Sequence, residues 1–374
     1  MKIKQLQLKG EWQIKDGDDK AGLVLVFGDR DMIGASDIAG KFKTAFPSAK
    51  IVFCSTAGEI LNTEVRDNTL AVTSVTFDKT NIKTSLSSIT DFKDSYAAGK
   101  ALVENLKQDD LKHIIVLADG QMVNGSELVR GMNEALPANV TISGGLAGDG
   151  SRFQKTLVGL DSNIVAGNIV AIGLYGTHLV VGHGSNGGWD SFGPYRKVTK
   201  SKSNVLYELE GKSALELYKQ YLGDLASGLP GTALLFPLSI KTDDNSEPVT
   251  RTVLSVSEAD QSMTFAGDIP EGSMARLMKA NFDRLIDAAS GAATNTFTPF
   301  NGMQPELALL ISCVGRKLVL DQRVDEEVES VRDILGDKTF MTGFYSYGEI
   351  SPLTRSNKCE LHNQTMTITA FSEI

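Results

Sequence analysis

Three short turns in this sequence join a glycine to a carboxylate at the end of an apolar run. They are Ala57-Gly58-Glu59, Ala147-Gly148-Asp149 and Tyr347-Gly348-Glu349. A glycine at the end of a strand allows a backbone with positive φ and leaves room for a ligand, while the next residue presents its carboxylate there. Carboxylates so placed are suited to holding an ammonium group or to acid–base chemistry. The same pair is also ordinary turn chemistry, and we interpret Gly267-Asp268 in that way.

The first two turns belong to an internal repeat. Residues 23–60 match the sequence 90 positions later without a gap. The first copy has Val26, Asp29, Met32, Ser36, Ala45, Pro47, Ala57 and Gly58 where the second has Val116, Asp119, Met122, Ser126, Ala135, Pro137, Ala147 and Gly148. This match predicts that the two segments fold alike.

Each copy follows the order β-α-β-turn-β. Short branched apolar runs at 23–27 and 114–118 predict buried strands. Helices are expected after Ser36 and Ser126 as N-caps, and Pro47 and Pro137 end them. A second strand leads into the glycine turn, and alternating segments, 68–77 and 168–176, supply the third strand.

The C-terminal half contains a more diverged copy. It consists of a strand at 306–312, a helix at 325–336, an extended segment at 339–346, the third turn and a strand at 363–371. Before it, residues 274–291 are expected to form one helix. We therefore predict an α/β fold of two domains, built from repeated β-α-β-turn-β units with helices packed on mixed sheets. The domains are predicted at 1–224, with repeats at 23–77 and 113–176, and at 225–374, because 223–232 concentrates glycine and proline.

Composition limits the class of protein. The 374 residues are 41% hydrophobic and 22% charged, which is typical of a globular chain, and the formal charge of −9 argues against nucleic-acid binding. No segment approaches the roughly 20 apolar residues needed to cross a bilayer, and the opening residues lack a signal-peptide pattern. Three widely spaced cysteines suit a reducing compartment. We expect a soluble cytoplasmic protein without membrane insertion.

Four segments carry a resemblance to a known family. The sequences CSTAGEI (54–60), GGLAGDG (144–150), GFYSYGEI (343–350) and CELHNQTMT (359–367) resemble the FIST family, which pairs an N-terminal and a C-terminal FIST domain. The resemblance spans roughly residues 20–370. It implies a sensory module of intracellular signal transduction that binds a small ligand, often proposed to be an amino acid. It carries no catalytic role, so we expect no enzyme, and we expect the state of the sensor to pass by contact to a separate signalling protein such as a histidine kinase.

The predicted ligand lies between the two domains and touches all three turns. Glutamate or aspartate serves the ammonium group of an amino acid, and Arg316 either binds its carboxylate or balances a neighbouring acid. Tyr345 and Tyr347 add apolar walls, and Glu360 and His362 share one face of an extended segment. The predicted ligand-binding residues are Cys54, Ser55, Thr56, Gly58, Glu59, Gly144, Gly145, Gly148, Asp149, Arg316, Tyr345, Tyr347, Gly348, Glu349, Glu360, His362 and Asn363.

Two other functions are left open by the sequence. Some members of the family are described as haem-containing nitric-oxide sensors that govern a histidine kinase, and four histidines are available as axial ligands: His113, His178, His183 and His362. An enzyme could use the clustered carboxylates, or Cys54 or Cys313 with His362 as base. A metal site is not expected, because the C-x-x-H of Cys359 and His362 lacks a second ligand pair, and no cofactor is expected apart from the haem alternative.

Overall fold

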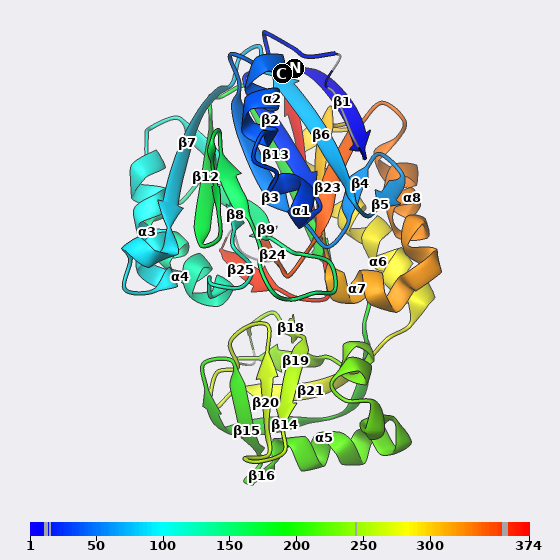
Figure 1. Cartoon of the computed structure of the whole chain (residues 1–374). Coiled ribbons are helices and arrows are strands. Elements are labelled where there is room, and N and C mark those ends of the chain that lie inside the picture. Colours follow the sequence, from blue (N-terminus) through cyan, green and yellow to red (C-terminus); the bar gives the residue numbers. More distant parts are fainter. Residues whose placement is uncertain (11–13, 15, 244, 354–357) are drawn as a thin grey trace.

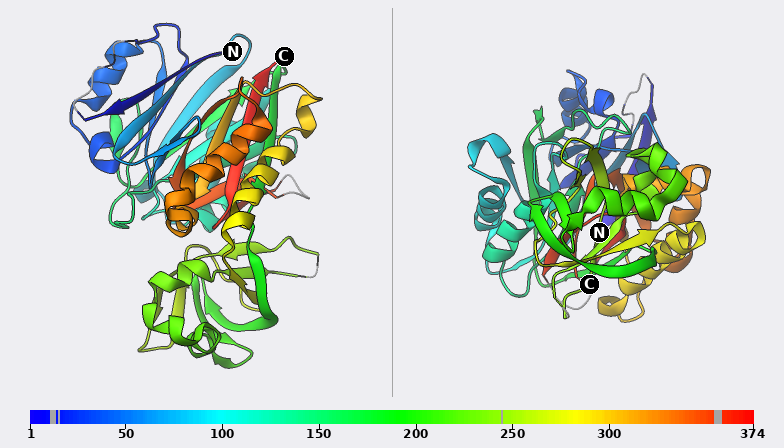
Figure 2. Two further views of the ribbon diagram at one scale, coloured as in Figure 1. Left: turned by 90° about the vertical axis from the view of Figure 1, so that its right-hand side faces the viewer. Right: turned by 90° about the horizontal axis from the view of Figure 1, so that it is seen from below.

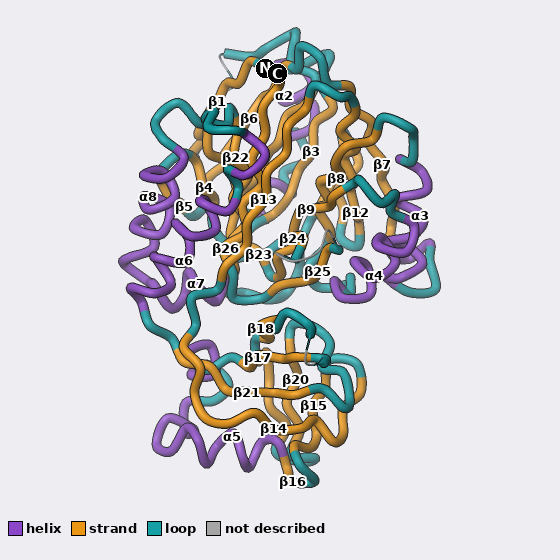
Figure 3. Tube along the Cα trace, turned by 180° about the vertical axis from the view of Figure 1, so that it is seen from behind, coloured by secondary structure: helices purple, strands orange, loops and turns teal. Residues whose placement is uncertain are grey.

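The computed structural model describes residues 1–10, 14, 16–243, 245–353 and 358–374. A larger body, residues 1–186 and 282–374, lies above a smaller body, residues 190–279 (Figure 1). Two chain crossings on one side join the bodies, and both termini lie at the far end of the larger body (Figures 1 and 3). Among the described helices, none has the length and apolar character that a membrane span requires.

The larger body contains three units of the same topology. In each unit the first strand pairs in parallel with the second and antiparallel with the third, which agrees with the β-α-β-turn-β order. The first unit consists of β2 (Leu23–Gly28), β3 (Lys50–Ser55) and β6 (Thr69–Thr76), and the second of β8 (Leu111–Ala118), β9 (Thr141–Leu146) and β12 (Asn168–Tyr175). The third unit consists of β22 (Leu307–Cys313), β23 (Phe340–Ser346) and β26 (Met366–Glu373).

Helices cover the outer face of each unit. The connecting helices are α1 (Arg30–Ile33) and α2 (Ile38–Ala45) in the first unit, α4 (Gly125–Ala135) in the second, and α7 (Val314–Leu320) and α8 (Val324–Leu335) in the third. Two further helices, α3 (Ser95–Leu106) and α6 (Phe282–Asn295), pack on α4 and α8. The left panel of Figure 2 shows α6 and α8, in yellow and orange, on the outside of the larger body.

The units exchange strands in a cyclic order. The hairpin after each glycine turn pairs with a strand of another unit. The hairpin of β4 (Glu59–Leu61) and β5 (Glu64–Arg66) pairs with β23 through β4, and the hairpin of β10 (Val158–Leu160) and β11 (Asn163–Val165) pairs with β3 through β10. The hairpin of β24 (Gly348–Pro352) and β25 (Cys359–His362) pairs with β9 through β24. At the opposite edges, β7 (Asn81–Ser88) joins β12, β13 (Leu179–Asn186) joins β26, and β1 (Lys2–Lys9) joins β6. The result is three six-stranded sheets around a pseudo-threefold axis.

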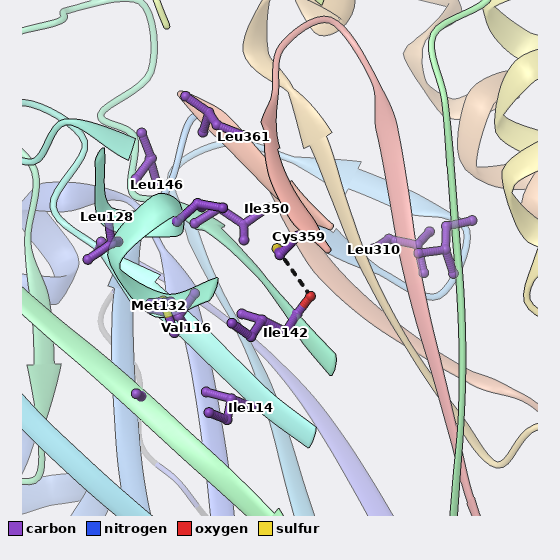
Figure 4. Close-up of a cluster of buried hydrophobic side chains, with 14 of the residues drawn as sticks. Ile114, Val116, Leu128, Met132, Ile142, Leu146, Leu310, Ile350, Cys359 and Leu361 are labelled. Atoms are coloured by element: carbon purple, nitrogen blue, oxygen red, sulfur yellow. Dashed lines mark hydrogen bonds between the residues drawn. The ribbon is translucent and has the colours of Figure 1, made fainter. Parts of the chain in front are cut away.

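Exchange of hairpins makes the core continuous between units. Figure 4 shows Leu128 and Met132 of α4 beside Ile350 and Leu361, which belong to the hairpin of the third unit. All four side chains are buried in one cluster that also includes the strands of the second unit. A unit therefore completes its core only by contact with its neighbour.

The smaller body is a curled sheet with one helix. Its eight strands are β14 (Asp190–Lys202), β15 (Val205–Leu209), β16 (Lys212–Ser213), β17 (Leu238–Lys241), β18 (Val249–Arg251), β19 (Val253–Ser257), β20 (Ser262–Phe265) and β21 (Met274–Lys279). The edge strands β18 and β19 follow one another in the sequence, separated by Thr252, so the sheet must curl to bring its two edges together. Helix α5 (Ala214–Leu222) packs on it, capped by Ser213.

The α/β fold of repeated units with helices on mixed sheets is confirmed, while details of the elements differ. Ser36 and Ser126 are not the N-caps: Asp37 and Asn124 precede the helices, and the Asn124 Oδ1 accepts from the Glu127 amide at 3.1 Å. The single helix predicted over 274–291 is instead β21 followed by α6, because residues 274–279 pair with strands on both sides.

The two bodies of the structure do not coincide with the two domains predicted at 1–224 and 225–374, because the smaller body spans residues 190–279. Strands from both sides of that division share sheets, for example β4 with β23 and β9 with β24. The physical reason is that each hairpin completes the open sheet edge of another unit. The third unit thus belongs to the larger body, and the smaller body interrupts the chain between β13 and α6.

Candidate functional site

The three glycine turns meet at the centre of the larger body. We call residues 55–59, 144–150 and 345–349 the turn centre. They contact one another directly through backbone hydrogen bonds, so the turns pack against each other. The hydrogen bonds run from the Ala57 amide to the Tyr345 carbonyl (2.8 Å), from Tyr345 to Gly58 (2.8 Å), from Gly148 to Ser55 (2.9 Å), from Gly150 to Thr56 (3.1 Å) and from Tyr347 to Leu146 (3.1 Å).

Glycine is required in the turn centre by close packing. A Cβ on Gly148 would lie 2.8 Å from the Ala57 nitrogen, and a Cβ on Gly144 would lie 1.8 Å from the Val116 carbonyl oxygen. Gly145 and Gly348 are also packed against neighbouring side chains. Gly145, Gly148 and Gly348 therefore serve the approach of one unit to the next, and Gly144 serves the approach of β9 to β8 within its unit. Sequence alone does not separate such packing from the approach of a ligand.

Glu59 is buried and held by its own unit. It accepts hydrogen bonds from the hydroxyl of Thr56 at 2.6 Å and from the hydroxyl and amide of Thr69 at 2.7 and 3.2 Å. Burial raises its pKa to about 7, and the hydrogen bonds from the two threonines oppose that rise.

Glu349 repeats this arrangement in the third unit. Its carboxylate accepts from the hydroxyl of Ser346 at 2.7 Å and from the hydroxyl and amide of Thr365 at 3.0 and 3.2 Å. Burial raises its pKa to about 8. Two of the three acids are thus satisfied by hydroxyl and amide donors of their own unit.

Asp149 differs, because it links the turn centre to an aromatic pair of which one ring, Phe153, is exposed. It accepts from Arg30 Nη1 at 3.1 Å and from the Tyr347 hydroxyl, whose pKa rises through burial and through this carboxylate. Phe153 stacks on Tyr347 with ring centroids 4.6 Å apart. Phe153 is 43% exposed and has a φ of 50°, a backbone conformation that bulky residues seldom adopt and that is frequent at functional sites.

Arg316 balances a neighbouring acid, which is the structural role that the sequence left open. It is fully buried, pairs with Glu327 at 2.6 Å, and donates to the carbonyls of Gly187 at 2.5 Å and Leu285 at 2.7 Å. Glu327 also accepts from Tyr345 at 2.6 Å. Arg316 and Tyr345 therefore face the interior of the third unit, and the predicted contact of Arg316 with a ligand carboxylate is wrong.

The segment with Glu360 and His362 divides between two environments. The His362 Nε2–H donates to the Ser351 carbonyl at 3.2 Å, and burial lowers the pKa of this imidazole to about 4. Glu360 instead faces Arg251 of the smaller body at 3.4 Å. Asn363 donates to the His362 carbonyl at 3.0 Å. The predicted joint action of Glu360 and His362 on one ligand finds no support in these contacts.

The thiols are poorly suited to nucleophilic chemistry. Cys54, Cys313 and Cys359 are all buried and free, and burial raises the pKa of each thiol above its ordinary value. A raised pKa lowers the thiolate fraction that would attack a substrate. The contact of Cys359 drawn in Figure 4 is with the carbonyl of Ile142.

A cavity of about 650 Å³ lies between the two bodies, and we call it the interbody cavity. Its upper wall includes Tyr347, Phe153 and Leu146, and its lower wall includes Thr252 and Asp268 of the smaller body. Most of the lining is apolar or small. Among the described residues that line it, Asp268 alone has a charged side chain.

Polar groups at the interbody cavity have unused hydrogen-bonding capacity. Thr252 is only 5% exposed, and its hydroxyl has no hydrogen-bond partner among the described residues. Asn124 and Gly125, the first residues of α4, also line the cavity, and a helix N-terminus attracts negatively charged groups. A buried polar atom without a partner is the kind of group that a bound molecule satisfies.

A second cavity, of about 560 Å³, adjoins the turn centre at Glu59. Its ionic side chains are largely paired: Lys317 with Asp67, and Arg152 with Asp29 at 2.8 Å. Lys317 also donates to the Ala57 carbonyl at 3.0 Å, so an ammonium group of the protein already occupies the position beside the first turn.

The structure brings together only some of the ligand-binding residues that the sequence predicted. The three turns converge, but of the predicted set only Tyr347 lines the interbody cavity, and only Thr56, Gly58 and Glu59 line the second cavity. Sequence reasoning missed Thr252, Asn124 and Phe153, and it dismissed Asp268 as turn chemistry. One signal in the sequence could have identified Asp268: the pair Gly267-Asp268 in FAGDIPEGS has the same glycine–acid pattern as the three turns, and Asp268 lines a cavity.

Comparison with known proteins gives the family. The FIST N domain matches residues 22–212, and the FIST C domain matches residues 214–352. The chain belongs to the FIST family. FIST domains are associated with sensing in signal transduction. The boundary between the two matched FIST domains lies within the smaller body, between β16 and α5.

Two individual proteins are similar to this FIST chain. The uncharacterized protein MJ1623 of Methanocaldococcus jannaschii is 26% identical over 229 residues, covering 56% of this chain and 41% of that protein. The chain thus spans about two-fifths of the length of this relative. A crystal structure of a chorismatase aligns over 99% of this chain and 98% of its own with 9% identity and a TM-score of 0.36. Similarity at that level carries no argument about activity.

Proposed function

We propose that this protein is a sensor module that binds a small metabolite in the interbody cavity. The observation that carries the proposal is a cavity of about 650 Å³ between two bodies of a FIST chain, with an aromatic pair on one wall and Asp268 and Thr252 on the other. Ligand sites in proteins commonly have volumes of roughly 300–1,000 Å³ and combine apolar walls with a few polar groups.

The lining favours an amino acid or a similar compound with an ammonium group. Asp268 offers a carboxylate to the ammonium group, and the positive end of the α4 dipole, at Gly125, favours a carboxylate. Phe153 and Tyr347 offer an apolar face to a side chain. The sequence analysis predicted the three turn acids as partners of the ammonium group, and we assign that role to Asp268 because it lines the interbody cavity.

The two alternatives have weaker support. None of the residues that line the described cavities is a histidine, and His113 is buried against Thr141 and Ser143 with a pKa lowered to about 3 by burial. This gives no specific support to axial haem ligation. The buried thiols give no support to nucleophilic catalysis, so we propose a binding role without turnover. We further propose that the protein acts in the cytoplasm and signals through a separate protein such as a histidine kinase.

Thermal-shift measurements test the proposal. The full chain is melted with each of the twenty amino acids, and a ligand at about 100 times its Kd should stabilise the fold by about 2.7 kcal/mol, or raise Tm by about 4 °C. Asp268→Asn should abolish the shift. Asp260→Asn, an exposed aspartate of the same body, should keep it.

Two results would contradict the proposal. If no amino acid shifts the melt while added haemin gives a stable Soret band, the haem alternative replaces it. If an amino acid shifts the melt equally in Asp268→Asn and in the Asp260→Asn control, the ligand binds elsewhere.

A further inference from the structure

The two bodies contact each other on opposite sides of the interbody cavity, and the two contacts differ in chemistry. On the side of the chain crossings the contact is apolar. Trp189 is buried with Leu285, Val319 and Leu320, and its indole donates to the Gln364 carbonyl at 2.7 Å. This contact buries large apolar side chains of both bodies.

The chain crossing itself is rigidly fixed. Arg316 donates to the Gly187 carbonyl at 2.5 Å and to the Leu285 carbonyl at 2.7 Å, so the buried Arg316–Glu327 pair anchors both the crossing and α6. Gly188 has a φ of 72°, and a Cβ there would lie 2.2 Å from the Arg284 carbonyl oxygen. The crossing is therefore a well-defined pivot.

On the other side of the cavity the contact is polar and depends on Arg251 of β18. Its side chain is 4% exposed and donates to the Leu361 carbonyl at 2.8 Å, which belongs to β25 of the larger body. It also lies 3.4 Å from Glu360, which is 35% exposed, and donates to the Asp268 carbonyl at 3.1 Å. A Cβ on Gly267 would lie 2.8 Å from the Arg251 Nε, so a glycine is needed beside this guanidinium.

Asp268 completes this contact with two bonds to the start of α4. Its amide donates to the Ser126 hydroxyl at 3.2 Å, and its Oδ1 accepts from the Asn124 side chain at 3.3 Å. We call the contact of Arg251 and Asp268 with Leu361, Glu360, Asn124 and Ser126 the latch.

Space lies on both sides of the latch. Asp268 lines the interbody cavity on one side, and on the other side Arg251, Asp268 and Glu360 line a separate cavity of about 460 Å³. Among the described residues, the bodies therefore meet here through a narrow bridge of four hydrogen bonds, two of them longer than 3.2 Å. A narrow polar bridge exchanges its bonds for water at small net cost, whereas separating the apolar side would expose buried surface.

We propose that the smaller body swings about the crossing and that the latch opens and closes the interbody cavity. A ligand in the cavity contacts Asp268 of the smaller body and the Phe153–Tyr347 pair of the larger body together. Such a ligand binds only the closed arrangement and shifts the population toward it. The control of this motion by a ligand rests on the proposed function, while the motion of the ligand-free protein does not.

Pulsed electron paramagnetic resonance measures the motion directly. Spin labels are attached to Glu104→Cys on α3 and Lys212→Cys on β16, two exposed positions, because the native thiols are buried. In the ligand-free full chain, Arg251→Ala should increase the population at a longer distance by roughly tenfold, since a hydrogen bond from a charged group contributes about that factor. Arg276→Ala, which removes a half-buried arginine from β21 of the same body, should match the parent.

Several outcomes decide the proposal. An unchanged distance distribution in Arg251→Ala would overturn the latch. If that variant does not fold, Ser126→Ala, which removes only the acceptor of the Asp268 amide, should raise the longer-distance population by a smaller factor, and no change there would overturn it equally.

A final measurement separates this inference from the proposed function. L-phenylalanine, at a concentration that saturates its thermal shift, should collapse the distribution to the shorter distance. If phenylalanine binds but both distances persist, the cavity is not coupled to the latch and the regulatory part of the inference is wrong. If neither phenylalanine nor any other of the twenty amino acids shifts the melt, the ligand class is wrong, and the ligand-free comparison of Arg251→Ala with Arg276→Ala still decides whether the latch exists.

Discussion

The turn centre and the interbody cavity both gather polar groups at the ends of strands, yet they differ in what those groups contact. In the turn centre, Glu59 and Glu349 are buried and accept hydrogen bonds from threonine and serine of their own units. In the interbody cavity, the Thr252 hydroxyl has no partner among the described residues, and the Asp268 carboxylate accepts from the Asn124 side chain at 3.3 Å at the edge of the cavity. Buried acids that are already satisfied stabilise a fold, and unsatisfied groups beside a cavity are free to recognise a ligand.

This contrast makes a general prediction about substitutions. Changes in the interior of the units should lower the free energy of unfolding, whereas changes in the interbody cavity should lower ligand affinity at nearly constant stability. The following four predictions test it in order of decreasing expected effect on stability.

The largest effect is expected at Arg316. Arg316→Ala leaves the Glu327 carboxylate buried without its cation, and breaking a buried pair costs about 3–5 kcal/mol. Arg323→Ala is the matched control, because this arginine is exposed and its pairs with Asp283 and Glu326 lie at the surface. Denaturant unfolding should show the loss in the first variant and no measurable change in the second. Equal stability of the two variants would contradict the structural role of Arg316.

The free energy of unfolding should depend on pH because of the raised pKa of Glu349. Its pKa is about 8 in the folded protein and near 4.5 when unfolded, so the folded state binds the proton more tightly. The resulting stabilisation is complete below pH 4.5 and is lost as the pH rises through 8. Glu349→Gln should flatten this decline, and Glu59→Gln should flatten it less, since its pKa is about 7.

Unfolding curves between about pH 5 and pH 9 measure that decline. A parent protein whose stability is constant over this range, or a Glu349→Gln variant that keeps the full decline, would show that the turn centre does not hold protonated acids.

Tyr347 belongs to both regions and should give an intermediate effect. Tyr347→Phe removes the hydroxyl that donates to Asp149 and accepts from its amide, and it should lower the free energy of unfolding by about 2 kcal/mol. The aromatic face toward Phe153 remains, so ligand affinity should change little. Tyr195→Phe, at an exposed position of the smaller body, serves as control in the same denaturant titration. A loss of affinity without a loss of stability would place the hydroxyl in the ligand site instead.

The smallest effect on stability is expected at Phe153. Phe153→Ala removes an exposed ring and should change the free energy of unfolding by no more than about 0.5 kcal/mol, while ligand affinity should fall about tenfold. Phe340→Ala removes a similarly exposed ring from the start of β23 and should leave affinity unchanged. Isothermal titration with the amino acid found by thermal shift gives both affinities, and an equal loss in the two variants would break the contrast between the regions.

Much of each unit could be predicted from the sequence, because strands and helices of a unit depend on nearby residues. The match of residues 23–60 to the sequence 90 positions later located β2, β3, β8 and β9. Prediction failed where a distant partner decided the outcome. Residues 274–279 have helical character by themselves but lie between β14 and β17, and Ser126 is occupied by the Asp268 amide instead of capping α4.

The candidate site was less predictable, for the same reason. A glycine followed by an acid looks the same in the sequence in two different environments. At Gly148-Asp149 another unit fills the space beside the turn, whereas Gly267-Asp268 lines a cavity. The partner of Arg316 was likewise undecided until α8 placed Glu327 against it.

By itself, the sequence determined that the chain builds three β-α-β-turn-β units with acids at their turns, because apolar periodicity and turn residues act over a few neighbouring positions. Only the tertiary structure decided that the units exchange hairpins, that the turns pack on each other, and that a cavity forms against the smaller body. Those outcomes depend on which open sheet edges and unsatisfied polar groups meet in space, and that pairing is made between residues far apart in the chain.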